Sequence, residues 1–279
     1  MQKLFRDISF KTSRLVTKSY STSFSIAVSY LDRDIGEAIY SIYGFVRFAD
    51  EIVDTFHDYD RDTLLTRFER DYDEAISTGL SLNPVLNSFQ ETVKKFNIPD
   101  DLVRSFLKSM RADLVKSDYM SREETDEYIY GSAEVVGLMC LMVFVNGSKS
   151  LYEELREPAR RLGAAFQKVN FIRDIKNDVE LLDRKYFHHT VGREFTEEVK
   201  KVIIDEIYDD FRQSWKGIRR LPQGSRTGVL IAYYYYLALL RKIEKTPAAK
   251  QFENRIRIPD YIKFLILGKA VMKNKLRLV

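Results

Sequence analysis

Two segments of the chain carry pairs of aspartates four residues apart. In the first segment, an arginine and a tyrosine precede the pair at helical spacing, so the four side chains share one face of a helix. They are Tyr43, Arg47, Asp50 and Asp54. Two carboxylates at this spacing repel each other by roughly 0.2–0.5 kcal/mol on an isolated helix. The neighbouring residues are mostly apolar, so a divalent cation would turn an unfavourable polar stripe into a binding site.

The second segment repeats this arrangement with amides upstream of the aspartates. Its members recur at helical spacing and are Gln167, Asn170, Asp174 and Asp178. Arg173 directly precedes the first aspartate. One such pair is common on a solvated helix face, whereas two pairs in otherwise apolar helices indicate a shared function.

Carboxylate oxygens are ligands that suit a hard cation. Magnesium in particular binds a few carboxylates together with the phosphate groups of a substrate, and manganese is an alternative. Two facing helices of this kind therefore predict a clamp that holds a diphosphate through bridging metal ions. Cations that would neutralise the phosphate oxygens lie close by in the sequence, at Arg47, Arg173, Lys176 and Arg184.

Helices are the elements that must position these stripes. The chain has only 12 glycines and 6 prolines in 279 residues, which is few turn-forming residues for an all-β protein. Apolar residues recur at helical spacing, with prolines near the breaks, and Pro84, Pro158 and Asp100 are expected in first turns or caps. The pattern predicts helices over 35–56, 61–78, 84–96, 100–116, 122–145, 158–181, 195–219, 227–245 and 260–275. We expect a single all-α domain over residues 1–279, built as a helical bundle.

Composition excludes several classes of protein. The net charge is only +4 with both signs dispersed, which argues against nucleic-acid binding. Cys140 is the single cysteine, so intrachain disulfides and cysteine-based zinc sites are excluded. The longest apolar stretches, 135–145 and 229–240, are shorter than the ~20 residues that span a bilayer, so we expect buried helices and a cytoplasmic protein.

The end of the chain is basic and apolar at once. Residues 261–279 contain Lys263, Lys269, Lys273, Lys275 and Arg277 but no acid, interleaved with large apolar residues. Two interpretations are open, a tail that lies peripherally on an anionic membrane and a packed helix with a solvated basic face.

Four blocks of the sequence resemble the phytoene/squalene synthase family, the head-to-head prenyltransferases, and are closest to bacterial phytoene synthases. The blocks are YSTSF at 20–24, RFADEIVD at 47–54, YIYGSAEVVG at 128–137 and QKVNFIRDIKND at 167–178. They occur in the expected order, and a weaker likeness continues to about residue 258. Two departures stand out, Glu51 where many members have a second adjacent aspartate, and His188 where the family usually has proline.

The resemblance implies the isoprenoid synthase bundle with a central cavity, and a role for each matching position. The four aspartates, Asp50, Asp54, Asp174 and Asp178, would hold magnesium. Diphosphate oxygens would be contacted by Ser21, Ser23, Arg47, Arg173 and Arg184. The region where carbocations form would be lined by Tyr43, Tyr128, Gln167 and Asn170. Later family positions are matched by Tyr236 and Arg255.

The resemblance also implies a reaction. Two molecules of geranylgeranyl diphosphate would condense through a cyclopropyl diphosphate to phytoene, without NADPH. Squalene or dehydrosqualene synthase, acting on farnesyl diphosphate, is an alternative within the family. Outside it, the acidic pairs alone would also permit a head-to-tail prenyltransferase, a terpene cyclase or a helical scaffold without catalytic activity.

Some further residues are expected to be structural. Asp113 and Asp118 fit a solvated helix face better than another metal site, and His188 and His189 are assigned no role. Cys140 is expected in the core, with one face that could border a prenyl chain. Of the four consecutive tyrosines at 233–236, one or two are expected to reach the cavity.

Overall fold

The regular structure of the described residues is helical, and no strand occurs among them. The computed structural model describes residues 1–115, 121–180, 195–251 and 255–276, with the helical backbone alone for 176–180. In chain order the helices are α1 (Gln2–Tyr20), α2 (Thr22–Val28), α3 (Arg33–Asp54), α4 (Arg61–Thr78), α5 (Pro84–Phe96), α6 (Asp100–Asp113), α7 (Arg122–Ile129), the π-helical turn η1 (Tyr130–Glu134), α8 (Val135–Phe144), α9 (Lys149–Glu180), α10 (Glu197–Ile218), α11 (Gln223–Lys245), α12 (Ala248–Gln251) and α13 (Asp260–Lys275). The all-α fold class is confirmed.

Local signals define several helix ends as expected. Helix α5 begins at Pro84, whose missing N–H costs nothing there, and the Asn83 side chain accepts a hydrogen bond from the Val85 N–H at 3.0 Å. Helix α4 ends at Gly79, which adopts the left-handed conformation with φ of 81°. The bounds of α4, α5 and α13 equal the predicted ones.

Other expectations were wrong. Pro158 does not start a helix, because α9 begins at Lys149, and the proline ring packs where α10 presents Gly217. A Cβ at Gly217 would lie 2.4 Å from the Pro158 Cβ, so the glycine permits this close approach. Asp100 is not a cap either, since Pro99 occupies that position and the Asp100 carboxylate accepts the Tyr72 hydroxyl at 3.0 Å. Helices α1, α2 and α12 were not predicted.

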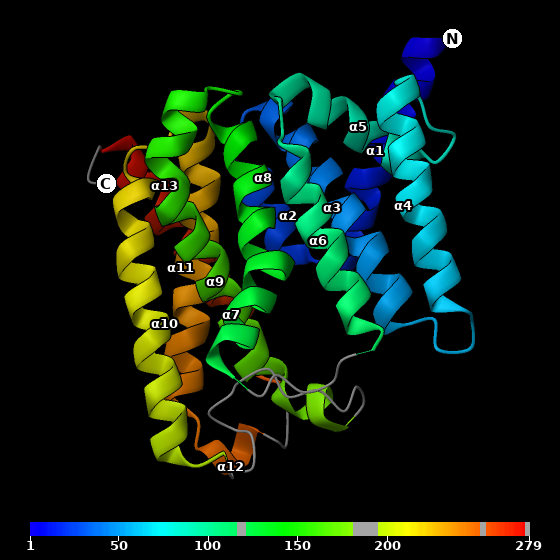
Figure 1. The fold of residues 1–279 in the computed structure, drawn as a ribbon. Coiled ribbons are helices and arrows are strands. Elements are labelled where there is room, and N and C mark those ends of the chain that lie inside the picture. The colour runs from blue at the N-terminus through cyan, green and yellow to red at the C-terminus, as the bar shows by residue number, and fades with distance from the viewer. Residues whose placement is uncertain (116–120, 181–194, 252–254, 277–279) are drawn as a thin grey trace.

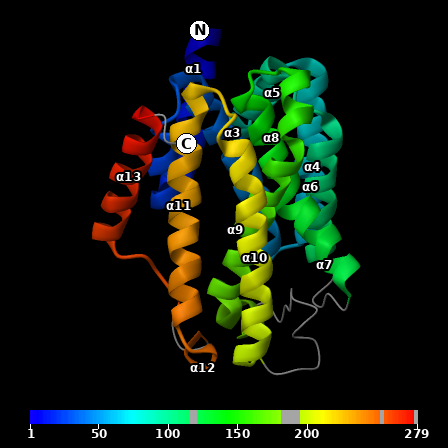
Figure 2. The same ribbon diagram turned by 90° about the vertical axis from the view of Figure 1, so that its left-hand side faces the viewer.

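Three helices form the middle of the bundle. Figure 1 shows α10, α11 and α13 at one side and α4 and α5 at the other, with α3, α8 and α9 between them. Figure 2 looks onto the side that α10, α11 and α13 form. One continuous hydrophobic core extends from α2 to α13. Aromatic rings fill its α3 side, where Phe45 stacks on Phe89 with ring centroids 4.0 Å apart.

Helix α8 lies in this core. The segment Arg122–Phe144, which runs through α7, η1 and α8, is the one helical stretch among the described residues that is long and apolar enough to cross a membrane. Half of its most apolar window is buried inside the bundle, and Val135, Leu138 and Met139 are fully buried. The expectation of a buried helix over 135–145 is thus confirmed.

The π-helical turn η1 packs tightly between α6 and α9. A Cβ at Gly131 would lie 1.9 Å from the Ser109 Oγ of α6, and a Cβ at Gly163 of α9 would lie 2.8 Å from the carbonyl oxygen of Ala133. Both glycines therefore permit close packing of helix backbones. π-Helical turns of this kind are frequent at functional sites, and η1 lies beside the cavity described next.

Candidate functional site

A cavity of about 580 Å³ lies between α2, α3, α8, α9 and α11, within the usual size range of small-molecule sites. One end is apolar and is lined by residues such as Val28, Leu31 and Phe144. The other end collects the charged groups, which are Arg47, Asp50, Asp54, Asp113, Arg173, Asp174 and Arg255. A ligand with one charged end and a long apolar chain matches this division.

Helices α3 and α9 both run from the apolar end of the cavity toward its charged end. Along α3 the lining proceeds from Ile39 to Asp54, the last residue of the helix, and along α9 it proceeds from Leu155 to Asp174. The carboxyl end of a helix carries a partial negative charge, which adds to that of the aspartates. This end of the cavity therefore attracts cations.

The first acidic stripe is under electrostatic strain. No hydrogen bond or ion pair joins Asp50 to another described residue, and burial together with the nearby Asp54 raises the pKa of the Asp50 carboxyl from 3.8 to about 7. Arg47 opposes this shift but donates to Glu51 and stacks over the Tyr20 ring, 4.3 Å from its centroid. The buried Nε of Arg47 has no hydrogen-bond partner in the described part of the chain. Arg47 thus keeps a donor available for a ligand.

In the second stripe, Asp174 is neutralised by arginines. The Arg173 Nε donates to the Asp174 carboxylate at 3.0 Å, and Arg255 donates to both Asp174 oxygens at 2.7 and 3.2 Å. The sequence expectations for Arg173, Asp174 and Arg255 thus fall on one cluster at the charged end. The Asp178 side chain and all of Arg184 lie outside the described residues.

Aromatic and amide side chains line the cavity between its two ends. Tyr43 stacks on Phe24 at 5.1 Å, and burial raises the pKa of the Tyr43 hydroxyl to about 12, so the phenol stays protonated near neutral pH. Tyr236 is the one of the four consecutive tyrosines that lines the cavity, and it stacks on Phe166 at 4.0 Å. The buried Oδ1 of Asn170 has no hydrogen-bond partner among the described residues.

Two further residues of this lining have polar or weakly polar side chains. The Gln167 Nε2 is 3.5 Å from the Ser132 Oγ of η1, at the limit of a hydrogen bond. Cys140 borders the cavity from α8, and burial raises the pKa of its thiol to about 12, so it stays protonated. Cys140 is partly buried, packs against the core and borders the cavity, and a prenyl chain beside it stays a prediction.

The two serines of the first block differ in position. Ser21 lines the cavity and caps α2, where its Oγ accepts the Phe24 N–H at 3.4 Å. Ser23 is partly buried on the same helix but is not among the described residues that line the cavity. Of the two, Ser21 is therefore the one that lines the cavity, and it follows Tyr20, whose ring lies under the Arg47 guanidinium.

Asp113 is a site residue that the sequence analysis misassigned to a solvated face. It is only 7% exposed, lines the cavity, and accepts a hydrogen bond from the Tyr128 hydroxyl at 2.9 Å. Its charge also contributes to the raised pKa of Asp50. A signal was present in the sequence, because Asp113 continues the apolar stripe of α6 that includes Phe106 and Met110.

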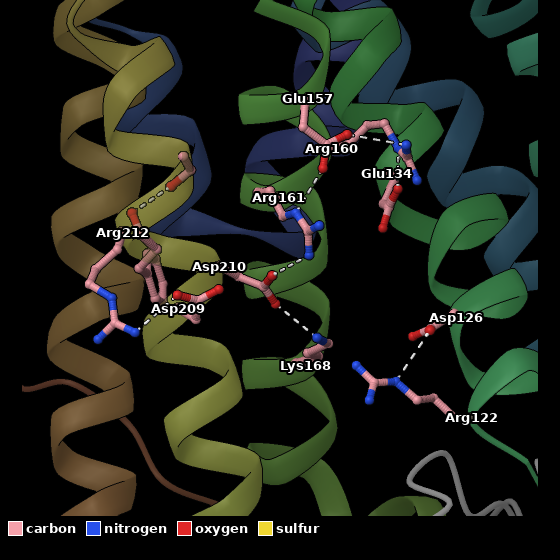
Figure 3. A network of polar contacts seen from close by, with 12 residues as sticks. Arg122, Asp126, Glu134, Glu157, Arg160, Arg161, Lys168, Asp209, Asp210 and Arg212 are labelled. Carbon is pink, nitrogen blue, oxygen red and sulfur yellow. Dashed lines mark hydrogen bonds and ion pairs between the residues drawn. The ribbon is translucent and has the colours of Figure 1, made fainter.

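A network of ion pairs holds α9 in position. In Figure 3 the buried carboxylate of Asp210 on α10 bridges Lys168 at 2.8 Å and Arg161 at 3.3 Å, both on α9. Arg160 of the same helix donates to Glu134 of η1 at 2.6 Å. Polar contacts on two sides therefore fix the helix that carries Asp174.

The acidic residues fit magnesium only in combination with a ligand. No three acidic, histidine or cysteine side chains in the described ranges converge closely enough to form a metal site. Magnesium commonly binds one or two carboxylates and completes its shell with water and substrate phosphates, so a closed protein cage is not required. Oxygen donors on two facing helices, one of them a destabilised carboxylate, suit this mode of binding.

Comparisons with known proteins agree with this architecture. A family model described as squalene/phytoene synthase matches residues 17–261. Phytoene synthase 1 of maize (Zea mays, chloroplastic) is 26% identical over 279 residues, which cover 94% of this chain and 67% of the maize protein. The 15-cis-phytoene synthase of Synechocystis is 28% identical and is covered over 85% of its length, against 95% of this chain. The chain spans about two thirds of the length of the maize enzymes.

A crystal structure of a dehydrosqualene synthase in complex with a ligand has the same fold. It superposes with a TM-score of 0.84 at 21% identity, over 97% of this chain and 98% of the other. With the acidic helices, the apolar cavity and the family match in agreement, the chain belongs to the squalene/phytoene synthase family.

Proposed function

We propose that the protein is a phytoene synthase that condenses two molecules of geranylgeranyl diphosphate head to head in a magnesium-dependent reaction. The observation that carries the proposal is the pairing of two acidic stripes with arginines at one end of an otherwise apolar cavity. The related proteins whose names include phytoene synthase support the choice of product.

In this proposal the charged end binds the diphosphates. Asp50 and Asp54 on one side and Asp174 and Asp178 on the other would hold magnesium, which as a Lewis acid stabilises the departing diphosphate. The guanidinium groups of Arg47, Arg173 and Arg255 donate to phosphate oxygens as charge develops on them. The ion pair between Arg255 and Asp174 opens when a ligand enters.

The apolar part of the cavity protects the reacting carbons. Loss of diphosphate from the first substrate leaves an allylic cation. The double bond of the second substrate attacks it, and the resulting cation loses a proton as the cyclopropane ring of a cyclopropyl diphosphate closes. That intermediate ionises in turn, rearranges and loses a proton. The rings of Phe24, Tyr43 and Phe166 exclude water and present π faces to a cation.

Product analysis tests the proposal. Purified protein receives geranylgeranyl diphosphate or farnesyl diphosphate, with magnesium or with chelator, and with or without NADPH. A forty-carbon hydrocarbon that requires magnesium but not NADPH is expected. A thirty-carbon product from farnesyl diphosphate alone would identify a squalene or dehydrosqualene synthase, and no hydrocarbon from folded protein would contradict an enzymatic role.

A further inference from the structure

Helix α13 exposes an apolar face on the outside of the bundle. Figure 2 shows it at the edge of the molecule, beside α11. It packs inward through Ile266 and Ala270, which are buried. Large apolar side chains on the opposite face are 58–73% exposed, namely Tyr261, Phe264, Leu265, Met272 and Leu276 just after the helix. Their spacing places them on one stripe along the helix.

This stripe is continuous with a shallow apolar groove. The groove is lined by Phe264, Met272 and neighbouring residues of α13 and, from the turn after α2, by Tyr30. Gly268 lies in the middle of the stripe, and a Cβ there would have no described neighbour within 4 Å, so the surface is open at this point. Leu31, the residue after Tyr30, lines the apolar end of the main cavity. The exposed face therefore lies beside the end of the cavity that would hold prenyl chains.

Lysines flank the apolar stripe. Helix α13 contains four lysines against one acid, Asp260, which pairs with Lys263 at 2.9 Å. Lys269 and Lys275 are exposed, and Lys275 borders the groove. The Lys269 Nζ lies 4.8 Å from the centroid of the Tyr234 ring, and the Lys273 Nζ lies 5.9 Å from that of Trp215. The surface thus combines an apolar centre with a positive rim.

We propose that this face of α13 docks on a lipid bilayer that contains anionic headgroups. An interfacial helix buries an apolar face among the acyl chains and places basic residues at the headgroups, where they attract anionic lipids. A second copy of this chain is a poorer occupant, because a symmetric contact would bring the lysines of the two α13 helices together. The proposal rests on the surface alone and not on the reaction.

Vesicle flotation tests the proposal without any substrate. Wild-type protein is expected to float with vesicles of phosphatidylcholine and phosphatidylglycerol, and high salt is expected to weaken binding because it screens the lysines. The double variant Phe264→Glu/Leu265→Glu should bind roughly tenfold more weakly or worse, since it places charge in the apolar stripe. The matched control is Leu80→Glu/Leu82→Glu, which changes two exposed leucines in the loop after α4 and should bind like wild type.

A second variant separates charge from apolar contact. Lys269→Glu/Lys275→Glu should reduce binding to the anionic vesicles by roughly tenfold or more and leave any binding to pure phosphatidylcholine unchanged. Wild-type protein that stays unbound, or α13 variants that bind as wild type does, would overturn the proposal. So would a wild-type dimer in solution that Phe264→Glu/Leu265→Glu converts to a monomer, because the face would then be an interface between copies.

Discussion

The two acidic helices face the same cavity but are built differently. On α3, Asp50 has no ion pair with another described residue, and the pKa of its carboxyl is raised to about 7. On α9, Asp174 is held by Arg173 and Arg255 in ion pairs of 2.5 and 2.7 Å. Before a ligand arrives, burial and the nearby Asp54 therefore destabilise the Asp50 carboxylate of the first helix, whereas Asp174 of the second helix is paired with two arginines.

This difference assigns the two helices distinct parts in binding. The first stripe gains when a cation enters, because the repulsion between Asp50 and Asp54 is then relieved. Under the proposed function the second stripe would exchange an ion pair for a ligand, and Arg255, at 47% side-chain exposure, is the more exposed of the two arginines that would take part. Protein stability and activity should therefore respond in different ways to changes on the two helices.

The largest expected effect is on turnover, where the two helices should behave alike. Asp50→Asn and Asp174→Asn each remove an oxygen anion from the charged end, and each should lower kcat by roughly a hundredfold or more. Steady-state rates of product formation with saturating magnesium measure this. Asp58→Asn, an exposed aspartate beyond α3, is the matched control and should leave the rate unchanged. A nearly active variant on either helix would show that this helix takes no part in binding.

A smaller effect is expected at Asp113, which lines the cavity from α6. Asp113 accepts the Tyr128 hydroxyl, so Asp113→Ala removes the acceptor, should misplace that hydroxyl and should lower kcat roughly ten- to hundredfold with little change in KM. Tyr128→Phe should have a similar effect, and the double variant should be no worse than the more affected single one. Additive losses would mean that the two residues act independently.

Stability without metal should separate the two helices. Asp50→Asn removes repulsion and should raise Tm by roughly 2 °C or more, whereas Asp174→Asn leaves the mostly buried Arg173 without its carboxylate partner and should lower it by a similar amount. Thermal unfolding in the presence of chelator measures both. Shifts of the same sign would contradict the proposed difference between the stripes.

The smallest of these effects is the pH dependence of stability, and its direction follows from the raised pKa of Asp50. The pKa of Asp50 is higher in the folded protein, about 7, than its ordinary 3.8, so the folded state binds the proton more tightly. The resulting stabilisation is complete below about pH 4 and is lost as the pH rises through about 7. The Tm advantage of Asp50→Asn over wild type should therefore grow between about pH 5 and pH 8. A Tm advantage of Asp50→Asn that shrinks over this pH range would contradict the raised pKa of Asp50.

Much of the fold could be predicted because local signals mark the helix ends. Pro84 and Gly79 are examples, since each fits one helix position for a steric reason. Helix α1 escaped prediction because its buried face consists of small polar residues, Ser9, Ser13 and Thr17, which pack in place of large apolar ones. A search for apolar periodicity does not detect such a face.

The candidate site was predictable where it depends on spacing within one helix. The stripes on α3 and α9 could be identified in this way, but contacts between distant segments could not. The pair of Arg255 and Asp174 joins residues 81 positions apart, and Asp113 meets Tyr128 because α6 packs against η1, which directly follows α7. These contacts depend on the tertiary fold, and they decide which aspartate is neutralised.

The central claim is that both helices hold one diphosphate through metal. The most direct test is calorimetric titration with a non-hydrolysable prenyl diphosphate analogue, with magnesium or with chelator, into wild type, Asp50→Asn and Asp174→Asn. We expect wild-type binding only when magnesium is present, and comparable losses of affinity in both variants. Binding that persists with chelator, or that only one of the two substitutions weakens, would contradict the claim.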